Sequence, residues 1–297
     1  MRAAPALQVV MYHYVRDLAR TPYPRIKGML LDDFRRQIDL LPRHYEMATL
    51  ESALAFLAGT YQAPRDLCLL TFDDGLKEHA RDVAPLLAER RIEGLFFVVT
   101  GCVEEHRVAP AHMNHFLMAS LDFKAYRLGF LKAVKHRAPE VAALAGREEN
   151  AAQACYPWDS REVACFKHFF NYRLDARLRD EIVRDLFASH IGPEAEFSRE
   201  LYLSWADARQ MRSAGMVLGG HSHRHRPLSS LTREELRTDL GTCRALLEER
   251  LGAQPVWPFC FPYGKHSSFN RAVVNELARL GFACAFTTMP GSNSCGA

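Results

Sequence analysis

The hydrophobic pattern of the chain alternates between short apolar runs and longer segments with helical spacing. Short apolar runs between turn signals predict buried strands, and apolar residues that recur every three or four positions predict helices packed on them. Seven strands are predicted, over residues 8–15, 46–48, 67–72, 94–100, 216–218, 256–261 and 282–287. Because helical segments separate these strands, we expect a parallel sheet, and about seven repeats suggest a barrel similar to the TIM architecture.

This alternation stops between residues 103 and 199. The segment contains no convincing strand, and helical spacing dominates over 116–134, 163–172 and 178–190. A stretch of this length is too long for a connecting loop in a compact domain. We therefore predict a barrel made of residues 1–102 and 200–297, with a helical insertion over 103–199 that shapes the substrate pocket.

The composition is that of an ordinary globular protein, with 48% hydrophobic and 25% charged residues. A net charge of +3 is too small to indicate a nucleic-acid partner. The eight cysteines include no C-x-x-C pair, so buried free thiols are expected rather than disulfides or a zinc knuckle. No signal-peptide pattern opens the chain, and no stretch approaches the ~20 apolar residues of a membrane helix. A cytoplasmic location is therefore expected.

Candidate chemistry begins where the strand over 67–72 ends, at Asp73 and Asp74. Two adjacent carboxylates make each other harder to ionise, and a nearby cation would remove this penalty. A second polar loop, Gly219 to His225, follows another strand, and its His221 and His225 can direct both imidazoles at one ion. Two histidines and the Asp74 carboxylate would leave coordination positions open for water and substrate, as catalytic metal sites do.

The same loop taken alone would equally fit a solvated basic loop. The acidic pair at another strand end makes the metal-site interpretation the stronger one. Within the loop, His223 is expected to point away from the ion, and Ser222 is expected to bond the loop backbone.

Thr71-Phe72-Asp73-Asp74-Gly75 and the H-S-x-x-H pattern over 221–225 resemble, in this order, the first two motifs of the polysaccharide deacetylases, the NodB-homology carbohydrate esterases. The runs over 11–13 and 285–288 also resemble that family. The resemblance implies a distorted seven-stranded (β/α) TIM-like barrel. It further implies that Asp73 is the catalytic base and that Asp74, His221 and His225 bind a metal.

The run Phe261-Pro262-Tyr263-Gly264 resembles the family's groove motif. The resemblance implies that Pro262 contacts substrate and that the backbone N–H of Tyr263 stabilises the oxyanion. The implied cofactor is a divalent cation, Zn²⁺ first, with Ni²⁺, Co²⁺ or Fe²⁺ as alternatives. Such a cation polarises an amide carbonyl and activates water, and Asp73 would take the proton of that water.

Two features depart from the family pattern. The run over 257–261 lacks the arginine that often orients the base, and no histidine follows His266, so the late Leu-x-His motif that supplies a general acid is missing. His13, at the end of the first strand, is our candidate for the acid, and a purely scaffolding role is the alternative.

Two further residues are candidate substrate contacts, each with a plain structural alternative. Arg224 lies beside the predicted site and would otherwise belong to a solvated loop. Trp158 resembles part of a sugar-stacking platform and would otherwise belong to the packed core of the insertion.

These features predict a metal-dependent deacetylase that removes an N-acetyl or other acyl group from a sugar or glycan precursor in surface polysaccharide biosynthesis. One alternative is a degenerate sugar-binding protein that kept the metal ligands and lost the acid. Another is an amide hydrolase acting on a non-sugar substrate. The expected partner is thus an acetylated sugar, with no nucleic acid, and the oligomeric state stays open.

Overall fold

The computed structural model describes residues 4–146 and 148–296, and the chain divides into two compact units. The first comprises Met1–Leu18, Lys27–Arg107 and Ser198–Ala297, and the second comprises Ala19–Ile26 and Val108–Phe197. The short segment Ala19–Ile26 joins the second unit because the ring of Tyr23 packs against Phe116 and Phe197. The hydrophobic pattern gave no sign of this assignment.

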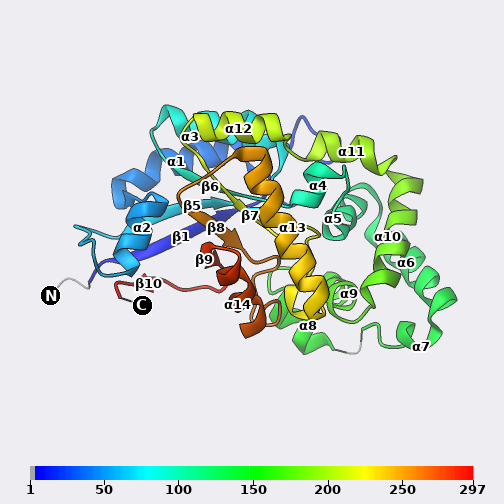
Figure 1. The fold of residues 1–297 in the computed structure, drawn as a ribbon. Helices are drawn as coiled ribbons and strands as arrows, with labels where there is room; N and C mark the ends of the chain where they lie inside the picture. The colour runs from blue at the N-terminus through cyan, green and yellow to red at the C-terminus, as the bar shows by residue number, and fades with distance from the viewer. Residues whose placement is uncertain (1–3, 147, 297) are drawn as a thin grey trace. The chain divides into compact units, whose positions relative to one another are not determined.

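The first unit is built on one eight-stranded sheet with the order β10-β1-β5-β6-β7-β8-β9, and β4 also pairs with β5 (Figure 1). All its pairs are parallel except β1 with β10. The strands are β1 (Ala6–Tyr12), β4 (Glu46–Met47), β5 (Leu67–Phe72), β6 (Gly94–Val98), β7 (Val217–Gly220), β8 (Trp257–Cys260), β9 (Phe282–Phe286) and β10 (Asn293–Ser294). The seven predicted strands are therefore confirmed. The prediction missed β10 and the pair β2 (Val15–Arg16) and β3 (Met29–Leu30). Each of these strands has only two residues, which is too short to show a hydrophobic periodicity.

Three helices of this unit begin directly after a Ser or Thr residue that caps them. Thr49, Ser204 and Thr232 each accept a hydrogen bond from the third residue of the following helix, as capping boxes do. The helices are α1 (Leu31–His44), α2 (Leu50–Leu57), α3 (Ala84–Glu89), α4 (Thr100–Glu104), α12 (Trp205–Ser213), α13 (Arg233–Leu251) and α14 (Arg271–Arg279), with a π-helical turn over His79–Val83. Another helix, α11 (Glu194–Leu201), crosses the boundary between the units.

Strand β5 lies between β1 and β6, and all six of its residues are buried. Leu67 and Leu69 belong to an apolar cluster that includes Phe56 of α2. Phe72 stacks on Phe96, with ring centroids 4.6 Å apart. Because both faces of this strand are packed, its carboxyl end has a fixed position. The backbone of Asp73 and Asp74, which follow it, is therefore also fixed.

The second unit is helical, and no strand occurs among its described residues. Its helices are α5 (Pro110–Ser120), α6 (Phe123–Arg137), α7 (Pro139–Ala142), α8 (Glu149–Cys155), α9 (Arg161–Tyr172) and α10 (Ala176–His190). The prediction of a single helix over 116–134 was wrong, because Asp122 accepts from the N–H of Ala125 and begins a new helix there. Aromatic side chains form its core, with Phe130 and Phe166 at 5.5 Å between ring centroids.

No helix in the described part of the chain combines the length and the apolar composition that a membrane span requires.

Candidate metal centre and active site

The candidate residues follow three strands of the same sheet. Asp73 and Asp74 come after β5, His221 after β7, and Tyr263 follows β8. Because these strands run parallel, their carboxyl ends lie at one edge, and the loops that leave them meet there.

Asp74, His221 and His225 form a buried cluster at this edge. Oδ1 of Asp74 lies 3.5 Å from Nε2 of His221 and 3.2 Å from Nε2 of His225. The three ligand atoms all lie within 4.8 Å of one another. The structure thus brings together three groups from two loops that are nearly 150 residues apart in the sequence.

The chemistry of this cluster fits a cation. Nδ1 of His221 lies 2.8 Å from the carbonyl oxygen of Cys260, and because a carbonyl only accepts, Nδ1 carries the hydrogen. Burial, with a smaller effect of His225, lowers the pKa of His221 to about 3, so the ring is neutral. Its Nε2 therefore presents a lone pair to the Asp74 carboxylate. Two acceptors that face each other in a buried site require a positive charge between them, and neutral imidazole and carboxylate are ligands of divalent metals.

The backbone at the site is unusual. Asp74, Ser222, His225 and Tyr263 have φ values of 77°, 64°, 52° and 64°. Six non-glycine residues in the described part of the chain adopt positive φ, and four of them are in these loops. Strained conformations of this kind persist where the surrounding structure imposes them, and they concentrate at functional sites.

Ser222 and His223 hold the loop from inside. The hydroxyl of Ser222 accepts from the N–H of His225 at 2.9 Å. The ring of His223 points away from the cluster, with Nδ1 3.0 Å from Thr100 Oγ1 and Nε2 2.9 Å from Glu105. The geometry of both side chains agrees with the sequence-based expectation.

Asp239 on α13 holds the loop from outside. Its buried carboxylate accepts from the backbone N–H groups of His223 and Arg224, at 2.9 and 3.0 Å. Partners of this kind fix the orientation of metal ligands. No sequence pattern marks this role, since Asp239 lies within an ordinary amphipathic helix.

Gly101 provides a test of how closely the loop is held. Its N–H donates to the carbonyl of His223 at 2.9 Å, and a Cβ atom at this position would lie 2.4 Å from that carbonyl oxygen. We expect Gly101→Ala to push the loop away and to weaken divalent metal binding by about tenfold or more, as loss of a partner of a metal ligand does. Isothermal titration with Zn²⁺ measures this. Gly241→Ala on α13, where the added Cβ meets no atom within 4 Å, should bind metal as the unmodified chain does, and equal binding by both variants would contradict the prediction.

Asp73 lies beside the cluster, and its two carboxylate oxygens have different surroundings. Oδ2 accepts from the thiol of Cys260 at 3.3 Å and lies 4.0 Å from His13 Nε2. Oδ1 is buried and has no hydrogen-bond partner among the described residues. Burial raises the pKa of Asp73 to about 6, against the lowering effect of His13. Burial also raises the pKa of the Cys260 thiol, so the sulfur keeps its hydrogen.

His13 is open to solvent at this position, with 41% of its side chain exposed. Its backbone carbonyl oxygen accepts a hydrogen bond from Nε2 of His79, 2.8 Å away. The fully buried ring of His79 therefore holds the backbone of His13 in place. His79 begins the π-helical turn, a feature frequent at functional sites. Sequence reasoning missed His79, because a histidine in a helical segment carries no distinguishing pattern.

Tyr263 lies next to the cluster of Asp74, His221 and His225. Its ring centroid is 5.3 Å from that of His225, and its carbonyl accepts from the hydroxyl of Thr288 at 2.9 Å. Pro262 beside it is buried. The turn at Tyr263, where φ is positive, is thus held by the ring contact with His225 and by the hydrogen bond from Thr288.

The two other candidate substrate contacts are both exposed. Arg224 lines a cavity of about 570 Å³ together with Arg226 and Glu234. Trp158 in the second unit is 94% exposed, so it does not belong to the core of that unit.

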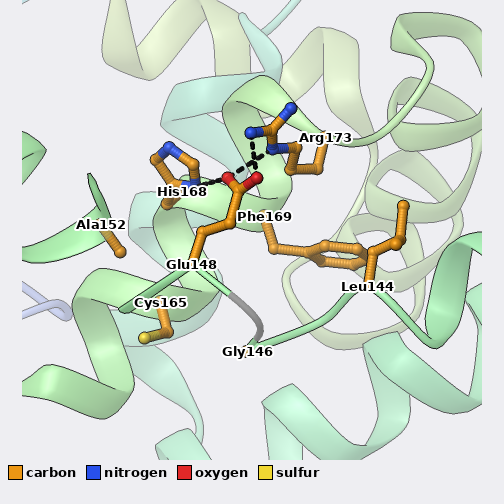
Figure 2. Close-up of a pocket in the computed structure, with 8 residues that line it drawn as sticks. All are labelled: Leu144, Gly146, Glu148, Ala152, Cys165, His168, Phe169 and Arg173. Carbon is orange, nitrogen blue, oxygen red and sulfur yellow. Dashed lines mark hydrogen bonds and ion pairs between the residues drawn. The ribbon is translucent and has the colours of Figure 1, made fainter. Parts of the chain in front are cut away.

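The second unit contains a small cavity (Figure 2). Glu148 points into it and forms an ion pair with Arg173, and its carboxylate lies 3.7 Å from Nδ1 of His168. Its volume is about 10 Å³, which is room for about one water molecule. This cavity is too small to hold a sugar.

Comparison with known proteins identifies the family. The family model described as polysaccharide deacetylase matches residues 60–137 and 179–285, more than half of the chain, including both strand-end motifs. The chain belongs to the polysaccharide deacetylase family. Members of this family are hydrolases that act on amide bonds, so the enzyme class expected from the sequence is confirmed.

Solved deacetylase structures share the fold of this polysaccharide deacetylase. The Streptococcus pyogenes deacetylase PplD in complex with acetate matches with a TM-score of 0.59 and 14% identity, over 98% of this chain and 88% of that one. IcaB from Ammonifex degensii gives 0.57 and 20%, over 98% and 89%. The BpsB deacetylase domain from Bordetella bronchiseptica gives 0.56 and 19%, over 98% and 93%. The expected (β/α) barrel-type fold is thus confirmed. None of the curated proteins compared with the chain matches it.

Proposed function

We propose that this polysaccharide deacetylase removes an N-acetyl group from a sugar or glycan precursor, with a divalent cation held by Asp74, His221 and His225. The observation that carries the proposal is the buried set of facing acceptors, with the open oxygen of Asp73 beside it. Zn²⁺ is the proposed metal, because the set offers two imidazoles and one carboxylate and leaves positions for water and substrate.

We assign each group of the site a separate catalytic role from its position. A divalent cation bound here would supply a Lewis acid for the acetyl carbonyl and would lower the pKa of water. Oδ1 of Asp73 would take the proton of the attacking water, because it is the carboxylate oxygen without a partner. The backbone N–H of Tyr263 would stabilise the developing oxyanion.

His13 is the proposed donor of the proton that the leaving amine requires. Its side chain is partly exposed and its Nε2 lies 4.0 Å from the base, so it can reach both solvent and substrate. We expect His13→Ala to lower kcat about a hundredfold, a typical loss for a general acid. Steady-state acetate release with saturating metal measures this. His44→Ala, an exposed histidine on α1, is the control, and unchanged turnover in His13→Ala would assign His13 to the scaffold.

The proposed substrate class and compartment have support of different kinds. PplD, which shares the fold, was solved in complex with acetate, and the BpsB domain is a deacetylase domain. These relatives support an acetyl group as the one removed. All eight cysteines are free, which supports a reducing compartment such as the cytoplasm, and we propose a glycan precursor of surface polysaccharide as the substrate there.

Acetate release tests the proposal directly. The purified chain, loaded with Zn²⁺ or treated with chelator, is incubated with N-acetylated mono- and oligosaccharides, with O-acetylated sugars, and with acetylated non-sugar amides. We expect release from the N-acetylated sugars in the metal-loaded chain only. Release from non-sugar amides alone would indicate a different amide hydrolase. Sugar binding without release from any compound would indicate a catalytically degenerate protein.

A further inference from the structure

Cys260 contacts both Asp73 and His221 in the candidate site. It is the last residue of β8 and is 2% exposed. Its sulfur lies 3.3 Å from Oδ2 of Asp73, and its carbonyl oxygen accepts from Nδ1 of His221 at 2.8 Å. One residue therefore contacts both the proposed base and a proposed metal ligand.

The thiol makes the two oxygens of Asp73 different. Oδ2 faces the sulfur of Cys260 and, farther off, the ring of His13 at 4.0 Å. Oδ1 has no partner among the described residues. The terminal torsion of an aspartate is broad and nearly two-fold, so a carboxylate without a fixed donor can exchange its two oxygens.

Within the described part of the chain, Cys260 is the one donor in hydrogen-bond distance of the Asp73 side chain. His13 is too far at 4.0 Å, and the adjacent Asp74 carboxylate offers no donor. The orientation of Asp73 in this chain therefore depends on a thiol.

We propose that Cys260 is a positioning residue, whose S–H donates to Oδ2 of Asp73 and so keeps Oδ1 directed at the reacting water. Its effect on catalysis rests on the proposed function, whereas the hydrogen bond does not. A thiol is neutral, so it orients the carboxylate without the strong charge pairing that a guanidinium would impose.

Infrared spectroscopy tests the hydrogen bond without any substrate. The difference spectrum between the unmodified chain and Cys260→Ala isolates one S–H stretch. That for Cys68→Ala isolates a buried thiol on β5 that makes no hydrogen bond within the described part of the chain. Because donation weakens the S–H bond, we expect the Cys260 band at lower frequency than the Cys68 band. This shift should disappear when Asp73 is replaced by alanine. Equal frequencies for the two thiols would overturn the proposal.

Kinetics test the positioning role. We expect Cys260→Ala to lower kcat about tenfold, with KM and Zn²⁺ affinity within about twofold of the unmodified chain. Cys260→Ser, which keeps a donor, should recover most of the loss. In an Asp73→Ala background, Cys260→Ala should cause no further loss, because groups that act through one residue are not additive. A full tenfold loss in that background, or no recovery with serine, would contradict a role through Asp73.

The two levels of the proposal can fail separately. If the unmodified chain releases no acetate from any compound, the proposed function fails, and the S–H band still decides whether Cys260 holds Asp73. If acetate is released and Cys260→Ala has unchanged kcat, the positioning role fails and the deacetylase function stands.

Discussion

Replacing Asp73 by asparagine should lower acetate release about a thousandfold while metal binding is retained. The amide has the shape of the carboxylate but cannot take a proton from water, and loss of a general base typically lowers the rate by 10²–10⁴. The three proposed metal ligands are unchanged in this variant, so its Zn²⁺ content should equal that of the unmodified chain. Acetate release and metal content, measured on the same preparations, separate the two effects.

Asp32→Asn is the matched control for this experiment. Asp32 is an exposed carboxylate on α1, paired with Arg35 at 2.7 Å, and lies outside the site. Its replacement should leave turnover unchanged. Acetate release by Asp73→Asn at the rate of this control would show that the chain uses another base.

The second large effect is expected at His225. His225→Ala removes one of three proposed ligands from the buried cluster and should weaken Zn²⁺ binding by more than about a hundredfold, beyond the loss typical for a residue that only supports a ligand. Acetate release should fall to the level of the chelated chain. Because a ligand that binds the folded state stabilises it, Zn²⁺ should raise the Tm of the unmodified chain and not that of the variant.

Two observations would argue against this interpretation of His225. One is a Tm increase with Zn²⁺ in the variant equal to that of the unmodified chain. The other is loss of folding in the metal-free variant, which circular dichroism would detect. His44→Ala at the exposed end of α1 controls for loss of a histidine as such.

The inner strands of the sheet could be predicted from sequence because β5, β6 and β8 are buried at every residue. Such strands are short apolar runs, and β5 with its six buried residues is the clearest case. The proposed metal ligands were accessible for a related reason. His221 follows its strand directly, and Asp74 follows Phe72 by two residues, so the parallel topology alone places them at one edge.

What sequence could not give are contacts that depend on tertiary packing. Asp239 lies within a helix and reaches the loop that carries His221 and His225 only because α13 packs beside it. In the sequence, Cys260 cannot be told from the other apolar residues of its strand. In the structure its thiol contacts Asp73, although two strands lie between β8 and β5 in the sheet. The break between α5 and α6 was missed because the apolar spacing continues through it, and only the Asp122 cap marks the new start.

Diffraction from a crystal grown with Zn²⁺, recorded at the zinc absorption edge, would locate the ion itself. We predict one strong anomalous peak, about 2.0–2.2 Å from Nε2 of His221, Nε2 of His225 and a carboxylate oxygen of Asp74, with Asp73 outside the coordination shell. A peak coordinated by Asp73 in place of Asp74, or the absence of a peak at this edge of the sheet, would contradict it.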